Sequence, residues 1–143
     1  MQTLVDSSVW LDYFRGVRSP RTDGLDRLIG QAPLLVADLT FEEVLHGLPD
    51  ERHRQLAADA LRKFWIVEIH GFALAEASTA NGHALRARGM DPDPVACRIA
   101  TYCIENGLAL LHDDEEYDPF EEHLGLQVPG LEVPLDPGAR STV

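Results

Sequence analysis

The sequence predicts an α/β domain of three layers, in which helices flank a central, largely parallel sheet of four or five strands. Short apolar runs recur along the chain, and each suits one buried strand. The stretches between them show helical spacing of apolar residues, and such alternation of strand and helix is typical of a parallel sheet. Three of the apolar runs also lead into acidic residues, at the strand ends where ligands bind in open α/β sheets.

The first half of the chain predicts three strands and four helices. The strands are expected over residues 2–5, 33–37 and 64–69, and the helices over residues 9–15, 22–30, 41–47 and 51–63. Ser7 or Ser8 is expected to cap the first helix, because a hydroxyl there accepts a backbone N–H. Gly16 and the Ser19–Pro20 pair are expected to break this first helix.

The second half predicts a long helix over residues 72–88, a helix over 94–106, a strand over 108–112, a short helix over 117–123 and an edge strand over 126–128. Asp93 followed by Pro94 is a standard helix start. Residues 1–128 are therefore expected to form one domain. Residues 129–143 are rich in Pro and Gly and are expected to form an extended or disordered tail.

Composition indicates a single globular domain, because 143 residues at 45% hydrophobic content can bury one core. The net charge of −12 argues against passive binding of nucleic acid. The basic residues are uneven, with four arginines among residues 15–27 and neither Lys nor Arg between Arg98 and Arg140. No apolar run reaches the ~20 residues of a membrane span and no signal-peptide pattern is present, so a cytoplasmic location without membrane association is expected.

Several other residues have structural interpretations. Cys97 and Cys103 would lie about 9 Å apart along one helix, too far for a disulfide, and are expected to be buried free thiols. His46 and His112 are near the expected cleft, but a lone histidine is more often a hydrogen-bonded structural residue. The aromatic side chains expected in the core are Trp10, Tyr13, Phe14, Phe64 and Trp65.

The acidic residues that follow the strands predict a metal site. Asp6 follows the first strand, Glu42 and Glu43 lie one turn beyond the second, and Asp113 and Asp114 follow the last long apolar run. Parallel strands would bring these carboxylates to one edge of the sheet. Two of them about 4 Å apart would repel by roughly 4 kcal/mol at an effective dielectric near 20. A hard cation such as Mg²⁺ relieves this repulsion, because oxygen ligands suit it.

Each acid also has an ordinary structural explanation. Asp6 can cap a helix. Thr40 and Glu43 fit a capping box, and Glu42 would point about 100° away from Glu43 around a helix. The acidic run that begins at Asp113 fits a solvated turn before a helix N-terminus. Their joint placement after three strands favours a functional site.

Four segments resemble the PIN-domain ribonucleases, and most closely the VapC toxins of bacterial toxin–antitoxin pairs. They are residues 4–11, 39–47, 97–108 and 111–117, in the order and spacing of that family. The resemblance covers residues 1 to about 128. It implies a first metal-binding Asp at Asp6 with a nearby hydroxyl at Ser8, a Glu at Glu43, a late Asp at Asp114 and a further acid at Glu116.

One position departs from the family pattern. The family has an Asp four residues before the Ala of the Ile99–Ala100 pair, and this chain has Ala96 there. Positions 96, 99, 100 and 103 share one helical face, so position 96 is expected to point toward the sheet. A metal-binding carboxylate is thus absent, and Asp93 is expected to be engaged as a helix cap. Natural loss and deliberate removal of a toxic activity would give the same sequence.

The resemblance implies a Mg²⁺- or Mn²⁺-dependent endoribonuclease toxin that hydrolyses tRNA or another structured RNA, forms a homodimer and is neutralised by a VapB-like antitoxin. Ala96 implies that this chain is catalytically impaired. The alternative is a non-catalytic PIN-like protein that acts in an antitoxin or repressor complex. A phosphatase or receiver-type acidic pocket is disfavoured, because Asp6-Ser7-Ser8 lacks an Asp-x-Asp pair and the single lysine, Lys63, precedes a strand.

Overall fold

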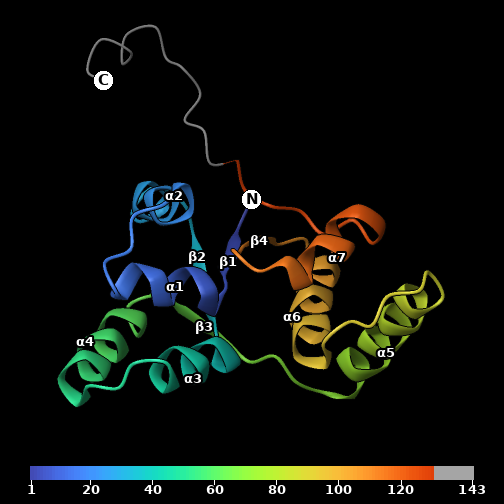
Figure 1. The fold of residues 1–143 in the computed structure, drawn as a ribbon, viewed down its shortest axis with the longest axis horizontal. Coiled ribbons are helices and arrows are strands. Elements are labelled where there is room, and N and C mark those ends of the chain that lie inside the picture. The colour runs from blue at the N-terminus through green and yellow to red at the C-terminus, as the bar shows by residue number, and fades with distance from the viewer. Residues whose placement is uncertain (131–143) are drawn as a thin grey trace, which may run out of the picture.

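Four parallel strands form the centre of the structure, a computed structural model that describes residues 1–130 (Figure 1). The strand order is β3-β2-β1-β4, and every neighbouring pair is parallel. The strands are β1 (Thr3–Val5), β2 (Leu34–Ala37), β3 (Trp65–Val67) and β4 (Ala109–Leu111). In the central register, Thr3 of β1 lies between Leu34 of β2 and Ala109 of β4. The prediction of a parallel sheet is therefore confirmed, with four strands.

Helices cover both faces of this sheet, as Figure 1 shows with α1, α2 and α4 on one side and α5, α6 and α7 on the other. The α-helices are α1 (Ser7–Phe14), α2 (Pro20–Leu28), α3 (Asp38–His46), α4 (Glu51–Leu61), α5 (Phe72–Arg86), α6 (Pro94–Glu105) and α7 (Asp118–His123). A 3₁₀ turn, η1 (Glu115–Tyr117), precedes α7. The expected three-layer α/β architecture is thus present.

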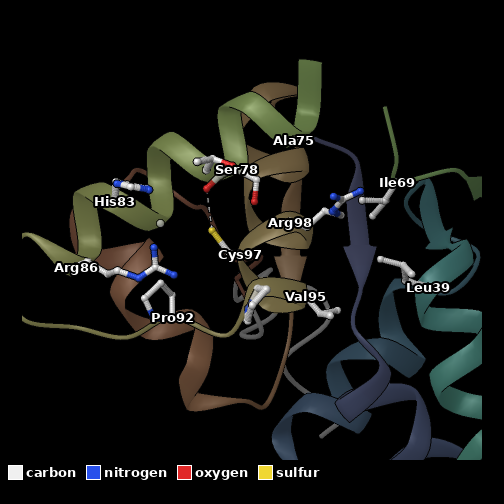
Figure 2. A pocket seen from close by; sticks show the side chains of 13 residues that line it. Leu39, Ile69, Ala75, Ser78, His83, Arg86, Pro92, Val95, Cys97 and Arg98 are labelled. Carbon is white, nitrogen blue, oxygen red and sulfur yellow. Dashed lines mark hydrogen bonds between the residues drawn. The ribbon is translucent and has the colours of Figure 1, made fainter. Parts of the chain in front are cut away.

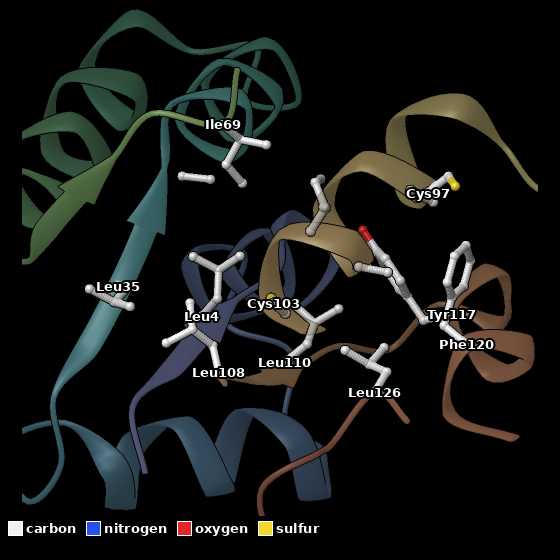
Figure 3. Packing of buried hydrophobic residues seen from close by; sticks show 14 of the residues in the cluster. Leu4, Leu35, Ile69, Cys97, Cys103, Leu108, Leu110, Tyr117, Phe120 and Leu126 are labelled. Atoms are coloured by element: carbon white, nitrogen blue, oxygen red, sulfur yellow. The ribbon is translucent and has the colours of Figure 1, made fainter. Parts of the chain in front are cut away.

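Successive strand residues point to opposite faces and so divide the core into two clusters. Leu4, Leu35 and Leu110 pack with α6 and with the segment that contains Tyr117 and Phe120 (Figure 3). Their neighbours in sequence join the second cluster, against α1 to α4; these are Val5, Val36 and Leu111. This alternation is the period of two that a pleated strand imposes. It explains why these short strands are apolar throughout, since a parallel sheet covered by helices buries both faces.

Three helix starts differ from the expected ones. Asp6, and not Ser7 or Ser8, is the N-cap of α1, and its side chain accepts a hydrogen bond from the Ser8 backbone N–H. Helix α2 begins at Pro20, two residues earlier than predicted, with Ser19 as its N-cap, and the expected break after the first helix is present because α1 ends at Phe14. Proline is tolerated there because its missing N–H would have no intrahelical partner. Helix α3 begins at Asp38, three residues earlier than predicted.

Two further expectations were wrong. Residues 126–128 do not form an edge strand, because Gln127 makes only an isolated bridge to Ala109. Trp65 is 75% exposed, since β3 is a three-residue edge strand. The prediction for the tail, residues 129–143, falls almost wholly outside the described residues. Among the described residues, no helix has the length and apolar character to cross a membrane, and Cys97 and Cys103 are buried free thiols.

Candidate functional site

Asp6 is buried at the carboxyl end of β1, with 3% of its surface exposed. Its Oδ2 accepts hydrogen bonds from the Ser8 backbone nitrogen at 3.1 Å and from the Ser8 hydroxyl at 2.6 Å. Its Oδ1 accepts a hydrogen bond from the Tyr117 hydroxyl at 3.0 Å. Oδ2 of Asp6 therefore caps α1, as the structural explanation predicts. Oδ1 is instead held by Tyr117, a residue far from Asp6 in the sequence.

Ser8 connects the ends of two neighbouring strands. Its hydroxyl donates to Asp6 and accepts a hydrogen bond from the Asp113 backbone nitrogen at 3.0 Å. Asp113 follows β4, as Asp6 follows β1, and β1 and β4 are neighbours in the sheet. Ser8, the predicted hydroxyl residue, thus helps to fix the loop after β4. This loop contains the late acids, which are Asp113, Asp114, Glu115 and Glu116.

The late acids lie in the loop after β4 and contact the start of α6. Asp114 caps η1, with its Oδ1 accepting from the Glu116 backbone nitrogen at 3.0 Å. Glu116 Oε2 in turn lies 3.4 Å from the backbone nitrogen of Asp93, the residue that caps α6. Two segments about 20 residues apart in sequence therefore meet beside the carboxyl end of the sheet.

Glu43 lies in α3 and is free of the capping box proposed for it. The helix is capped at Ala37 without a side-chain hydrogen bond, and the buried Thr40 hydroxyl has no partner. Burial raises the pKa of the Glu43 carboxyl, and the negative charges of Asp6, Asp93 and Asp114 raise it further, against a hydrogen bond from Ser7. The fold therefore brings Glu43 into the field of the acids that follow β1 and β4.

Position 96 lies at the start of α6 and faces inward, as its helical register predicts. Ala96 is 6% exposed, and it belongs to the same buried cluster as Ile99, Ala100 and Cys103. Its backbone nitrogen donates to Asp93 Oδ2 at 2.9 Å, which confirms the expected cap of α6. A methyl group stands where the family pattern places a carboxylate. Asp93 remains exposed and contributes charge at Glu43 from one turn earlier.

Sequence analysis did not identify Tyr117 as a site residue. Its ring is buried beside Phe120 in the cluster under α6 (Figure 3). Burial raises the pKa of the Tyr117 hydroxyl well above its usual value, and the Asp6 charge and hydrogen bond raise it further. The hydroxyl therefore stays protonated as a donor to Asp6. A tyrosine three residues after Asp114 is too common a pattern to have predicted this contact.

A second group of possible ligands surrounds His112. One ligand atom from each of His112, Asp118 and Glu121 lies within 4.8 Å of the others. His112 Nδ1 accepts from the Asp114 backbone nitrogen at 3.3 Å, which leaves the proton on Nε2 to donate to Glu121 Oε2 at 2.6 Å. This geometry supports the structural interpretation of His112, because a metal at Nε2 would have to displace that proton. His46 is exposed on α3.

A groove of about 530 Å³ lies beside the late acids, and its lining includes Asp91, Asp113, Asp114, Glu115 and Glu116. Two cations reach acids of this groove: Arg21 Nε lies 3.5 Å from Asp113 Oδ1, and Arg86 Nε lies 3.9 Å from Asp91 Oδ1. The remaining donors are carboxylate oxygens, which suit Mg²⁺ or Mn²⁺. Burial raises the pKa of Glu43, and the charges of Asp6, Asp93 and Asp114 raise it further. The residues present therefore fit a divalent cation, with one carboxylate fewer than the family pattern.

A family model described as PIN domain matches residues 3–122 of the chain. Similar solved structures include a VapBC complex from Rickettsia felis bound to a promoter DNA fragment, at 13% identity and a TM-score of 0.73, covering 90% of this chain and 98% of that one. A toxin–antitoxin complex from Klebsiella pneumoniae is similar at 22% identity and a TM-score of 0.68, covering 90% and 98%. A sarcin–ricin loop cleaving VapC toxin from Mycobacterium tuberculosis is similar at 15% identity and a TM-score of 0.60, covering 81% and 92%.

Proposed function

The chain belongs to the PIN domain family, and on that premise we propose that it is a VapC-type endoribonuclease toxin that hydrolyses RNA at a Mg²⁺ or Mn²⁺ site. The observation that carries the proposal is the placement of Asp6 and Asp113 after the neighbouring strands β1 and β4, where the Ser8 hydroxyl contacts both residues. A similar VapC structure is described as cleaving the sarcin–ricin loop, an RNA. This supports a structured RNA, such as rRNA or tRNA, as the substrate class.

Each predicted site residue has a role in this proposal. Asp6, Glu43 and Asp114 would hold the cation directly or through water, and Glu116 would be an outer ligand. The bound cation would lower the pKa of a water molecule and neutralise charge that develops on the phosphate oxygens. Ser8 and Tyr117 would orient Asp6 through the hydrogen bonds at its two oxygens.

Ala96 weakens the activity in this proposal without disrupting the fold. Its methyl group packs in the buried cluster of α6, so the domain keeps its core. Mg²⁺ sites often use only one or two protein carboxylates plus water. The remaining acids would therefore hold an ion weakly, while the attacking water would lack the carboxylate at position 96 that orients it.

The proposed partners are a cognate VapB-like antitoxin and a second copy of the chain. Similar structures are toxin–antitoxin complexes, and two of them are bound to DNA. An acidic toxin surface, at a net charge of −12, would favour a basic antitoxin segment.

The test is RNA cleavage by the given chain and by its Ala96→Asp variant, in Mg²⁺, in Mn²⁺ and with chelator. The expected result is metal-dependent cleavage by the variant and little or none by the given chain. Asp6→Asn in the Ala96→Asp background is the control, and it should abolish cleavage. Equal cleavage by both chains would show that the missing ligand is elsewhere.

The second candidate is a PIN-like protein without catalytic activity that acts in an antitoxin or repressor complex. The absence of a carboxylate at position 96 favours it. Antitoxin binding by both chains, with no cleavage of rRNA or tRNA by either, would support this second function over the first.

A further inference from the structure

We propose that the pocket between α5 and α6 binds phosphates of the RNA that flank the cleaved one, through Arg86 and Arg98. This inference rests on the proposed function, and it names a part of the substrate path that the acidic residues do not supply. The pocket has a volume of about 460 Å³. Figure 2 shows Arg86 projecting from α5 near Pro92, and Arg98 projecting from α6 near Ile69 and Leu39.

The charge of this pocket is opposite to that of the chain. Its lining residues include Arg86, Arg98 and His83, and no Asp or Glu is among them. The chain as a whole has a net charge of −12 and would repel a polyanion. A pocket lined by arginines and by no acid is a place where the local charge favours the approach of RNA.

Both guanidinium groups are available for a ligand. Within residues 1–130, Arg98 makes no hydrogen bond or ion pair with another residue. Arg86 has one ion pair, to Asp91 at 3.9 Å, and the Asp91 side chain is 97% exposed. An exposed pair of that length contributes little. A guanidinium offers paired N–H donors that match phosphate oxygens, so both residues suit this ligand.

The pocket adjoins the groove lined by Asp91, Asp113, Asp114, Glu115 and Glu116, called here the acidic groove. Pro92 lines both; the lining of the pocket includes Arg86 and Arg98, and the lining of the groove includes Asp114 and Glu116. Arg98 also follows Ala96 by two residues on α6. A strand whose cleaved phosphate lay at the acids could pass over Pro92 and place its next phosphates in the pocket.

The remaining lining distinguishes a nucleotide from a small anion. Ser78 and Thr79 contribute polar atoms, while Leu39, Ile69 and Val95 provide apolar contacts. A ribose or base can lie on such apolar surface while its phosphate meets the arginines. An acidic peptide would satisfy the arginines equally well, but the pocket shares Pro92 with the groove where the cleaved phosphate of the proposed RNA substrate would lie. The observations therefore favour RNA.

The test measures binding of a labelled RNA oligonucleotide in chelator, without cleavage, over a range of salt concentrations. Arg86→Gln with Arg98→Gln removes two charges from the pocket. Each lost phosphate contact lowers the salt slope of a single strand by about 0.7, so the double variant should lose about 1.4. Its affinity at low salt should fall at least about tenfold. The matched control is Arg52→Gln with Lys63→Gln, which removes two exposed charges near α4, and it should bind like the parent.

Three results would overturn the inference. The parent chain could fail to bind the oligonucleotide, the pocket variant could keep the parent's slope, or the control could lose as much affinity as the pocket variant. A polyglutamate peptide serves as a competitor: binding of the peptide that depends on the two arginines, with RNA binding unchanged, would assign the pocket to a protein partner. Failure of the proposed nuclease function is a separate result, because it is read from cleavage by Ala96→Asp and not from binding in chelator.

Discussion

The Tyr117 hydroxyl donates a 3.0 Å hydrogen bond to Asp6 Oδ1 across 111 residues of sequence. The other oxygen of the same carboxylate accepts from Ser8. Asp6 is thus held at both oxygens, by its own helix start and by the loop that contains Asp114 and Glu116. The orientation of the Asp6 carboxylate therefore depends on the position of the loop that contains Asp114 and Glu116.

Tyr117→Phe should therefore destabilise the protein and loosen Asp6. The substitution keeps the buried ring and removes a hydrogen bond to a charged acceptor, which contributes about 1.5–3 kcal/mol. Urea unfolding in chelator measures the loss. Tyr102→Phe is the control, because its hydroxyl makes no hydrogen bond within the described chain, and it should change stability by less than about 0.5 kcal/mol. Equal losses in the two variants would contradict the role assigned to this contact.

Glu43→Gln should stabilise the metal-free protein at neutral pH. The pKa of Glu43 is raised in the folded state, so its charged form is disfavoured there relative to the unfolded chain. The contribution of Glu43 to the free energy of unfolding of the parent is greatest below its unfolded pKa of about 4.3, where the group is protonated in both states. That contribution is lost as the pH rises through the folded pKa. The variant's advantage in urea unfolding should thus be present at pH 7 and vanish below about pH 4.

Glu42→Gln is the control for this pH dependence. Glu42 neighbours Glu43 on α3. Its substitution removes one negative charge from the same helix, and it should not reproduce the gain of Glu43→Gln at pH 7. A gain for Glu42→Gln as large as that for Glu43→Gln would mean that general charge reduction, and not the acids around Glu43, explains the effect.

The sequence was sufficient to locate the four strands, because a buried strand is a local apolar run. Asp6 and Asp113 follow apolar runs, and parallel pairing brings the ends of β1 and β4 together. The side chain at position 96 faces inward because helical periodicity requires it. Helix starts were less predictable: Ser7, Ser8 and Asp6 are all acceptable caps, and only the packed structure selects Asp6.

Residues that depend on tertiary contacts could not be predicted. Tyr117 meets Asp6 only because the loop after β4 folds back under α6. Trp65 was placed in the core on its hydrophobicity, but its strand is at the sheet edge, where no helix covers it. Strand order, which makes β3 an edge, is not encoded in any local pattern.

Native Cys103 should resist thiol reagents until the protein unfolds. Burial raises the pKa of its thiol to about 12, with a further contribution from the Asp6 charge, so almost no reactive thiolate exists at pH 8. Labelling by a chromogenic disulfide reagent should be slow in buffer and rapid in concentrated urea. A Cys97→Ser variant isolates the signal of Cys103. Rapid labelling of that variant without urea would contradict the burial of this residue.

Ala96→Asp should make stability depend on divalent metal. In chelator, the added carboxylate would be buried in the apolar cluster of α6 without a partner, and the variant should lose about 2 kcal/mol or more relative to the parent. Mg²⁺ at 100 times the dissociation constant should restore about 2.7 kcal/mol, because ligand binding stabilises only the folded chain. Thermal unfolding with increasing Mg²⁺ measures this, and the parent should gain much less. Ala96→Asn has nearly the same shape without the charge, so a gain in that variant equal to the gain in Ala96→Asp would exclude a ligand role for position 96.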